Sequence, residues 1–414
     1  MSTQALPLAG IRVIDYSHFL AGPFVSRNLA ALGAEVIKVE RPTAGDAGRA
    51  HAYFIDGQSG YYLQQNMGKQ GLCINLKDPR GLKMLHQLVE GADVFVENYR
   101  PGALDKLGLG YDELSKINPG LVYCSISAYG HTGPDSHRAG FGLIAEAKSG
   151  IMAMVGSPGE TPPLLRIALG DMYTGANSVA AICAALLGRV KSGRGQHIDM
   201  ALYDCLVSMH EYAIQCYTLS GGQEVPEPTG NDLPNSTLYG SFTASDGHLV
   251  IAAQVDDAWK RLALLIGGEA LAADTRFHSS AGRNENRLEI LALVRAWVAA
   301  RTVGEALAAL DAIDVPSAKV QRIDEVLADP QIQARGMVVE QQHPLLGKIS
   351  LGNLPYHFSG YDTTQTMAAP LLGQHNRQIA GSLGYTAQQI DALVSDGVLY
   401  AEAAVAGLDQ DQES

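Results

Sequence analysis

Short runs of apolar, often β-branched residues alternate with amphipathic stretches along the first part of the chain. The apolar runs are typical of strands, and they cover residues 11–15, 35–39, 71–76, 93–97 and 121–125. The stretches between them have apolar residues at helical spacing, and they cover residues 22–32, 79–91 and 111–117. Strands that alternate with helices of these lengths predict a parallel sheet covered by helices. Such a sheet binds ligands beyond the carboxyl ends of its strands.

The rest of the chain predicts a second, smaller domain. A long helical pattern over 172–190 still belongs to the first domain, and residues 221–234, rich in Gly, Pro, Glu and Asn, are typical of a linker. A hairpin pattern follows the linker. Three helical patterns come next, over residues 256–266, 287–300 and 303–311. We therefore expect an α/β protein with a large Rossmann-like parallel-sheet domain and a small α+β domain, over residues 1–220 with 333–414 and over residues 221–332.

Composition and charge exclude several classes of protein. Of the 414 residues, 46% are hydrophobic and 18% are charged, which is enough apolar surface for a large core and too much for long disorder. No apolar run reaches the ~18 residues of a membrane span. Met1–Leu8 lacks the basic start and apolar core of a signal peptide, and the five cysteines form no Cys-x-x-Cys pair, so we expect a cytoplasmic protein with reduced thiols. A net charge of −13 makes nucleic acids and anionic membranes poor partners.

The sequence lacks the common motifs for nucleotide and metal cofactors. Tyr16–Pro23 follows the first predicted strand without the glycine pattern of a dinucleotide-binding loop. No phosphate-binding loop of the GxxxxGK[ST] type occurs, and the 12 histidines show no metal-ligand spacing such as HExxH. We therefore expect neither a nicotinamide nor a metal cofactor.

Asp171 is the strongest candidate for a catalytic side chain. It lies within Ala168–Gly175, where the predicted long helix begins, and the pattern places it at the N-cap. Two interpretations follow from this position. An N-cap aspartate often does no more than accept hydrogen bonds from the free N–H groups of its helix. A helix N-terminus also keeps a carboxylate ionised, and such a carboxylate can attack an activated acyl group to form a covalent intermediate.

Several long motifs occur in the same order as in a known enzyme family. They are residues 14–23, 32–42, 96–108, 169–171, 193–199 and 324–336. Through them the chain resembles the class III CoA-transferases (CaiB/BaiF type), which are relatives of formyl-CoA:oxalate CoA-transferase. The resemblance implies that Asp171, in the Leu-Gly-Asp motif, is the catalytic nucleophile. It also implies an aspartyl-CoA thioester, mixed anhydrides, and a ring-shaped chain in an interlocked homodimer.

The resemblance further implies which residues contact coenzyme A. The predicted contacts are His18, Phe19, Leu20, Arg41, Lys77, Asn98, Tyr99 and Lys106. The first three would lie against the pantetheine and the thioester, and Arg41 would contact the adenine or a phosphate. From the residues alone, the charged members are typical of solvated surface side chains, and Asn98 is typical of a turn. Their place just after predicted strands favours ligand binding, because α/β sheets bind ligands at that edge.

Departures from the family pattern narrow the expected reaction. Phe141 stands where the racemase branch has the histidine of an Ala-Gly-His-Asp motif, so a racemase would lack that proton carrier here. Leu20 replaces a glutamine of the formyl-CoA enzyme, and Ala252–Asp257 lacks the glycines of the loop that covers the site of that enzyme. Both differences disfavour formyl-CoA as the donor.

The expected activity is CoA transfer from a short acyl-CoA, such as succinyl-CoA, to a small carboxylic acid. A cation near Asp171 would bind a second carboxylate of the acceptor, and the candidates are His131, Arg138 and Arg166. Three alternatives stay open. They are an acyl-CoA racemase or isomerase, a noncatalytic CoA-binding protein in which Asp171 caps its helix, and a nucleotide-dependent oxidoreductase, which the missing glycine motif disfavours.

Overall fold

The computed structural model describes residues 5–405 and divides into two compact units. Unit 1 combines three stretches of sequence, up to Ser149, Leu165–His210, and from Pro330 onward. Unit 2 combines Gly150–Leu164 with Glu211–Asp329. Residues 1–4 of the N-terminal segment considered above, and residues 406–414 at the C-terminal end, lie outside the described part.

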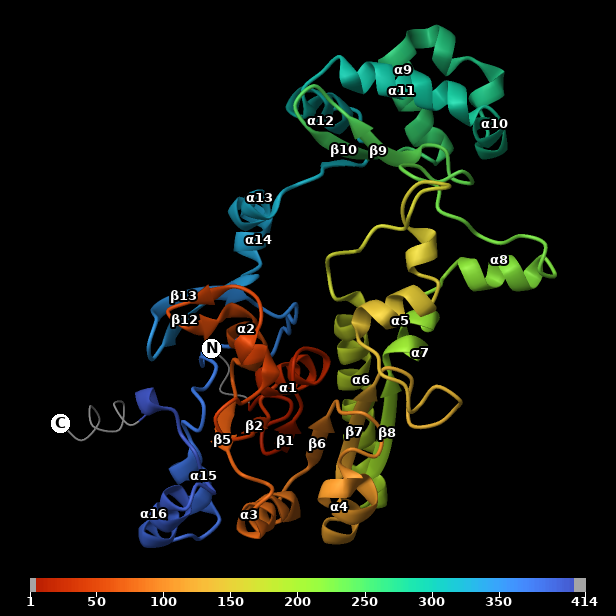
Figure 1. Cartoon of the computed structure of the whole chain (residues 1–414). Helices are drawn as coiled ribbons and strands as arrows, with labels where there is room; N and C mark the ends of the chain where they lie inside the picture. Colours follow the sequence, from red (N-terminus) through yellow and green to blue (C-terminus); the bar gives the residue numbers. More distant parts are fainter. Residues whose placement is uncertain (1–4, 406–414) are drawn as a thin grey trace. The chain divides into compact units, whose positions relative to one another are not determined.

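A six-stranded sheet forms the centre of unit 1, and every neighbouring pair of strands is parallel. In spatial order the strands are β5 (Gln70–Cys73), β2 (Glu35–Glu40), β1 (Arg12–Tyr16), β6 (Val94–Glu97), β7 (Val122–Ser127) and β8 (Gln196–Ala201). Figure 1 shows the strands side by side, with β5 at one edge and β8 at the other. The α/β class and the parallel sheet predicted from the alternating pattern are confirmed.

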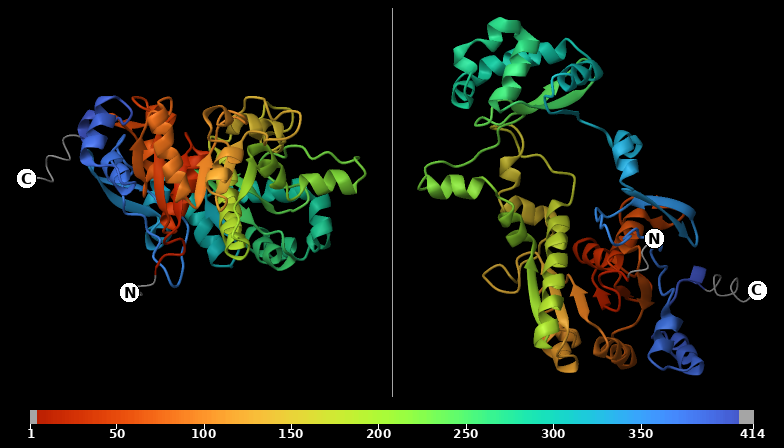
Figure 2. Two further views of the ribbon diagram at one scale, coloured as in Figure 1. Left: turned by 90° about the horizontal axis from the view of Figure 1, so that it is seen from below. Right: turned by 180° about the vertical axis from the view of Figure 1, so that it is seen from behind.

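Helices cover the sheet because the strands are apolar toward both faces. Ile14 and Phe95, in the middle of β1 and β6, are fully buried. They share one core with apolar residues of helices from distant parts of the sequence, α3 (Pro79–Glu90), α4 (Tyr111–Ile117), α15 (Asn376–Ser382) and α16 (Ala387–Ser395). The C-terminal helix α15 packs against β5, and the blue C-terminal part lies beside this edge of the sheet in Figure 1 and from behind in Figure 2.

The long helix α6 (Leu169–Ser192) packs against α1 (Ala21–Ala31). Gly175 allows the close approach, because a Cβ at this position would lie 2.6 Å from Cδ1 of Phe24. The small residues of α6 thus bring the helix that carries Asp171 onto the helix that follows β1.

Shorter elements complete unit 1. They are α2 (Gly60–Asn66), α5 (Gly142–Lys148), α7 (Leu202–Ser208), α14 (Pro330–Ala334), the two-residue strands β3 (Phe54–Ile55) and β4 (Gln58–Ser59), and the antiparallel pair β12 (Val338–His343) and β13 (Gly347–Gly352).

Unit 2 has its own sheet and its own core. The sheet is antiparallel, in the order β11 (Ser317–Lys319), β10 (His248–Ala252), β9 (Tyr239–Thr243), and the hairpin of β9 and β10 confirms the predicted turn. Its helices are α8 (Ala213–Leu219), α9 (Asp256–Ala272), α10 (Ser280–Glu285), α11 (Arg287–Ala299), α12 (Val303–Asp311) and α13 (Ile323–Ala328). Trp259, Phe277 and Val294 are buried in the core between this sheet and these helices.

Across residues 5–405, none of the helices combines the length and the apolar character needed to cross a bilayer.

Candidate active site

Most of the predicted CoA contacts follow the carboxyl ends of the parallel strands. His18 comes after β1, Arg41 after β2, Lys77 after β5, and Asn98 after β6. Because these strands are parallel neighbours, the loops that follow them emerge at the same edge of the sheet. The sheet therefore brings together residues that lie up to about 80 positions apart in the sequence.

The loop after β1 is tied to the loop after β6 by paired hydrogen bonds. The amide of His18 donates to Oδ1 of Asn98 at 2.8 Å, and Nδ2 of Asn98 donates to the carbonyl of His18 at 2.8 Å. The ring of His18 lies 4.5 Å from the ring of Tyr99, centroid to centroid. Burial lowers the pKa of His18, which favours the neutral imidazole. The structure thus places His18, Asn98 and Tyr99 in one cluster.

Phe19 turns the chain sharply before α1 begins. Its φ of 59° lies in the left-handed region, which costs about 1–2 kcal/mol for a residue other than glycine. The amide of Phe19 donates to Oδ1 of Asp46 at 2.8 Å, which holds this conformation. Leu20, the N-cap residue of α1, buries its side chain. The Phe19 ring meets the rings of His51 and Phe141 edge to face, at 6.4 and 6.5 Å.

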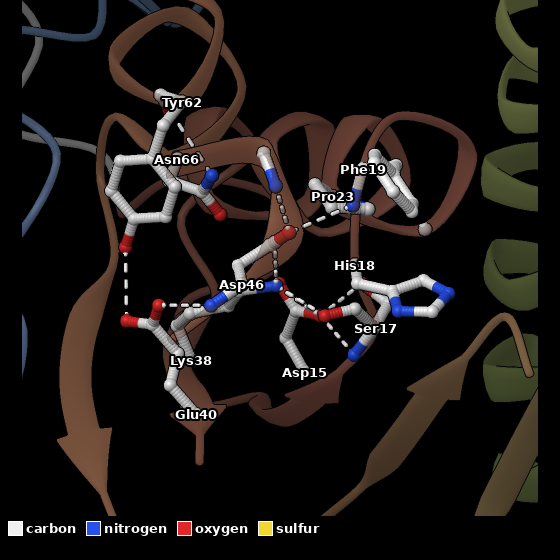
Figure 3. A network of polar contacts seen from close by, with 12 residues as sticks. Asp15, Ser17, His18, Phe19, Pro23, Lys38, Glu40, Asp46, Tyr62 and Asn66 are labelled. Carbon is white, nitrogen blue, oxygen red and sulfur yellow. Dashed lines mark hydrogen bonds and ion pairs between the residues drawn. The ribbon is translucent and has the colours of Figure 1, made fainter. Parts of the chain in front are cut away.

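A buried charge network, made of Asp15, Lys38, Asp46 and Lys69, supports this loop. Figure 3 shows Asp15, Lys38 and Asp46 beside His18 and Phe19. Nζ of Lys38 lies 2.9 Å from Asp46, and Nζ of Lys69 lies 2.9 Å from Asp15. Asp15 is fully buried, yet the two lysines and hydrogen bonds from serines overcome the effect of burial and hold its pKa well below the usual range. Nζ of Lys38 also donates to the carbonyl of Ser17 at 2.6 Å. The network therefore fixes the backbone just before His18.

A second buried ion pair continues the charge network. Glu40 accepts hydrogen bonds from Arg49 at 2.7 and 2.8 Å and from the hydroxyl of Tyr62 at 3.1 Å. It also accepts the amide of Asp46 at 2.9 Å, which links the pair to the network under the His18 loop. The loop that carries Arg41 is therefore held between two buried groups of charges.

The remaining predicted CoA contacts are exposed cations. Arg41 donates through Nε to the carbonyl of Gly45 at 3.2 Å. Burial raises the pKa of Tyr16, and the nearby charge of Arg41 opposes this rise. Lys77 is exposed after β5, and Lys106 is exposed in a short 3-10 helix, Asp105–Leu107. Within the described part of the chain, the side chain of neither lysine forms a hydrogen bond or ion pair with His18, Asn98 or Tyr99.

Asp171 lies in the first turn of α6, and the predicted N-cap position is wrong. The N-cap residue is Ala168, which has no side chain to cap the helix, and Asp171 is the third helical residue. Leu169 and Gly170 already have helical geometry, so the helix begins two residues before Asp171. The carboxylate therefore does not serve as an N-cap, and it is only partly exposed.

The surroundings of Asp171 are short of positive charge. Burial, and after it the nearby charge of Glu146, raise its pKa to about 6, while a hydrogen bond from its own amide opposes the rise. Glu146 is 3% exposed, and its Oε1 accepts the amide of Gly170 at 3.2 Å. Gly142 lies directly against the carboxylate, since a Cβ at this position would overlap Oδ2 of Asp171. A carboxylate with a raised pKa and few donors is a better nucleophile than a paired one.

Aromatic rings connect Asp171 with the His18 loop. The phenol of Tyr61 has its pKa raised by burial and, next in size, by the charge of Asp171. The ring of Tyr61 lies 4.9 Å from His51, and His51 meets Phe19. Phe141, next to Gly142, reaches Phe19 from the other side. The structure thus brings the predicted nucleophile and the predicted pantetheine loop into one site within unit 1.

The predicted acceptor cations are spread around this site. The amide of His131 donates to Asp199 at 2.9 Å, and its ring lies 5.1 Å from that of His197. Arg138 pairs with Asp135 at 3.1 Å, and Arg166 is exposed with a left-handed φ of 58°. Within residues 5–405, none of them forms an ion pair with Asp171 or acts on its pKa.

The segment Ala252–Asp257, in unit 2, runs from the last residue of β10 into the first turn of α9. The buried side chain of Arg283 donates to the carbonyl of Gln254 at 2.6 Å and to Asp256 at 2.7 Å.

Sequence reasoning missed several residues of the site. Lys38, Asp46 and Lys69 were not predicted, although a lysine in the middle of the apolar run of β2 is a signal that a buried partner exists. Glu146 was missed because nothing in the sequence indicates its contact with Gly170, which lies 24 positions away.

A family model described as CoA-transferase family III matches residues 8–376. The chain belongs to this family. The match spans both units, and a relative from mouse named succinyl-CoA:glutarate CoA-transferase is 36% identical over 95% of this chain and 90% of its own length. A relative from Chloroflexus aurantiacus named succinyl-CoA–D-citramalate CoA-transferase is 36% identical over 95% of this chain and 98% of its own length.

Solved structures agree with the family. A crystal structure of a CaiB/BaiF family protein from Brucella suis is 37% identical, covers 92% of this chain and matches over 100% of its own length, with a TM-score of 0.83. The family, together with curated relatives of this identity and coverage, identifies the chain as an enzyme, a CoA-transferase.

Proposed function

We propose that this CoA-transferase moves CoA from a short acyl-CoA, with succinyl-CoA as the leading donor, to a small carboxylic acid through Asp171. The observation that carries the proposal is the Asp171 carboxylate, with its pKa raised to about 6, held beside the aromatic rings that lead to the His18 loop. Nucleophilic catalysis needs a basic, weakly solvated group next to the bound thioester. The names of the relatives support succinyl-CoA as the donor and a dicarboxylic acid as the acceptor.

The first half of the reaction transfers CoA to the enzyme. One oxygen of Asp171 attacks the thioester carbonyl of the donor, the C–S bond breaks, and CoA leaves as a thiolate. The product is a mixed anhydride of Asp171 and the donor acid. The thiolate then attacks the aspartyl carbonyl, which forms an aspartyl-CoA thioester and releases the donor acid as a carboxylate.

The second half reverses these steps with the acceptor. The acceptor carboxylate attacks the aspartyl thioester, thiolate leaves, and a second anhydride forms. The thiolate then attacks the acyl carbonyl of the acceptor, so that the new acyl-CoA leaves and the Asp171 carboxylate is restored. Each step exchanges one activated carboxyl group for another, so the sequence is balanced without a further reactant. Water must be kept out because both the anhydrides and the thioester hydrolyse.

The predicted contacts give each part of CoA a place at the carboxyl edge of the sheet. We place the pantetheine and the thioester against His18–Leu20 and Tyr99, close to Asn98. Arg41, Lys77 and Lys106 stand at the same edge as cations for the phosphates or the adenine. The support for this placement is that β5, β2, β1 and β6 are parallel neighbours, so the loops that follow them emerge at one edge of the sheet.

The interlocked homodimer and the cytoplasmic location also belong to this proposal. Both rest on the resemblance and on the sequence, and an analytical ultracentrifugation run on the whole chain tests whether two chains associate. A mass of two chains is the expected result.

A racemase is the second candidate, but the residues present do not support racemisation. Racemisation at the carbon next to a thioester needs an acid and a base on opposite faces of the substrate. The position of the second proton carrier holds Phe141, a residue that is 68% exposed and whose ring carries no proton to donate. Deuterium uptake at the α-carbon of an acyl-CoA that has a stereocentre there, without an acceptor acid, would favour the racemase.

The deciding experiment compares Asp171→Asn with the wild type. Each protein is incubated with succinyl-CoA and hydroxylamine, and the peptide that contains residue 171 is analysed by mass spectrometry for a hydroxamate. We expect the hydroxamate at Asp171 in the wild type only, and a fall in turnover of at least about 10³-fold in the variant. Asp204→Asn is the matched control, because Asp204 also lies in the first turn of a helix, α7. Wild-type turnover in Asp171→Asn would contradict the proposal.

A further inference from the structure

Two residues of α5, one turn apart, face the proposed nucleophile. Gly142 leaves the space that Oδ2 of Asp171 occupies, and Glu146 accepts the amide of Gly170, the residue just before Asp171. Residues four positions apart lie on one side of a helix, so this side of α5 meets the first turn of α6. Glu146 is buried and pairs with no cation in the part of the chain that the structure describes. A buried carboxylate beside a second carboxylate is a costly arrangement that a purely structural role does not require.

We infer that Glu146 is a positioning residue, which orients the first turn of α6 through the Gly170 amide and keeps the Asp171 carboxylate reactive through its negative charge. This inference rests on the proposed function, because it assigns a task to Glu146 in the attack by Asp171. It names a residue outside the motifs that carry the family resemblance.

The hydrogen bond replaces a missing helix cap. The first amides of a helix have no acceptor within the helix, and the N-cap residue Ala168 offers none from its side chain. Oε1 of Glu146 accepts one of these amides, at Gly170, from a different helix. The orientation of the turn that presents Asp171 therefore depends on α5.

The charge acts on Asp171 directly. The groups that face its carboxylate are Glu146 from α5, the phenol of Tyr61 from α2, and its own amide in α6. Repulsion between two carboxylates raises the energy of ionised Asp171, and this repulsion disappears while Asp171 is acylated and neutral. The negative charge of Glu146 therefore favours formation of the covalent intermediate over the free carboxylate.

The test separates the hydrogen bond from the charge. Glu146→Gln keeps an oxygen that accepts the Gly170 amide and removes the charge, whereas Glu146→Asp keeps the charge and shortens the reach. The rate of hydroxamate formation at Asp171 is measured from pH 4.5 to 8.5 with succinyl-CoA. In Glu146→Gln we expect the acid limb of this profile to move to lower pH by about one unit and the plateau rate to fall about tenfold. In Glu146→Asp we expect an unmoved acid limb and a lower plateau.

The outcomes are distinct from those for the proposed function. Glu113→Gln, on the exposed face of α4, is the control and should match the wild type at every pH. A Glu146→Gln profile that overlays the wild type would overturn the inference while leaving Asp171 as nucleophile. If Glu146→Gln does not fold, Glu146→Asp is the deciding variant. A plateau rate of hydroxamate formation in Glu146→Asp equal to that of the wild type would also overturn the inference. Absence of any hydroxamate in the wild type would instead defeat the proposed function itself.

Discussion

Two groups of buried or partly buried carboxylates in unit 1 have opposite surroundings. Under the His18 loop, Asp15 and Asp46 each have a lysine within 3 Å, and hydrogen bonds occupy much of the remaining capacity. At the start of α6, Asp171 and Glu146 face each other, and the groups that act on Asp171 include no cation within the described residues. The pKa of Asp15 is held far below its usual range, and that of Asp171 is raised to about 6.

This difference separates a group that holds structure from a group whose surroundings suit the chemistry proposed for it. Opposite charges that satisfy one another stabilise one arrangement of the chain, and the loss of one member leaves a buried charge without a partner. A carboxylate that is short of partners costs stability and retains its basicity. The same side chain, aspartate, thus has opposite pKa shifts in one unit because its neighbours differ.

The largest expected effect comes from breaking the paired group. Asp15→Asn removes one carboxylate from the network and leaves Lys38 and Lys69 with too little negative charge in a fully buried place. We expect the free energy of unfolding to fall by about 3–5 kcal/mol, measured by urea unfolding followed through circular dichroism. Glu289→Gln, which breaks the exposed pair with Arg276, is the control and should change it by less than about 1 kcal/mol. An equal loss of unfolding free energy in the two variants would contradict the special role of the buried, paired carboxylates.

Filling the space beside the unpaired carboxylate should damage activity without damaging the fold. Gly142→Ala adds a methyl group where Oδ2 of Asp171 lies, and alanine is favoured in a helix over glycine. We expect kcat for CoA transfer to fall about 10- to 100-fold, because a displacement near 1 Å is enough to disturb attack. Gly188→Ala, on the open side of α6, is the control and should leave kcat unchanged. An active Gly142→Ala enzyme would show that the position of the carboxylate is not critical.

Neutralising the unpaired carboxylate should stabilise the protein. The pKa of Asp171 in the folded chain is about 6, above the value of 3.8 for an unperturbed aspartate, so this group favours the fold only as it becomes protonated. The wild type therefore gains stability from Asp171 as pH falls from about 6 to about 4. We expect Asp171→Asn to raise the free energy of unfolding by about 1–2 kcal/mol at pH 7.5 and by less at pH 4.5, checked by thermal melting at both pH values. A lower melting temperature at pH 7.5 would mean that the carboxylate is stabilising.

The smallest expected effects belong to the exposed cations at the edge of the sheet. Lys77→Ala or Lys106→Ala should raise KM for succinyl-CoA about two- to fivefold and leave kcat unchanged, because one solvated charge contributes little to phosphate binding. The increase should shrink as salt is added. Lys83→Ala, exposed on α3, serves as the control. Unchanged KM in both variants at low salt would remove these two lysines from the proposed CoA contacts.

Local patterns predicted the elements of this fold well. The apolar run at 35–39 became β2, Glu35–Glu40, and the helical patterns at 111–117 and 303–311 match α4 and α12 residue for residue. These elements follow from side-chain periodicity, which is a property of neighbouring residues. The start of α6 was wrong because it depends on the backbone at Ala168 and on an amide that Glu146 accepts from another helix.

The site could be predicted only where a motif marked it. Asp171 and the His18 loop were found because long motifs contain them, and the geometry places them in one site, while their roles stay predictions. The pairing of Lys38 with Asp46 and of Lys69 with Asp15 could not be read from spacing, since the partners lie on different strands and loops. A buried charge indicates that a partner exists, but only the fold decides which one.

Unit 1 is assembled from stretches that lie far apart in the sequence, so the ribosome synthesises them at different times. The ring of His375 accepts the amide of Gly71, the amide of Cys73 donates to Asn376, and Ile74 pairs with Leu399, so the last stretch shields the outer edge of β5. Until that stretch emerges, the edge of β5 offers unpaired peptide groups to any other chain, which is a known route to aggregation. Nascent chains of this enzyme should therefore depend on chaperones until synthesis is nearly complete, and a premature stop before residue 370 should yield insoluble protein.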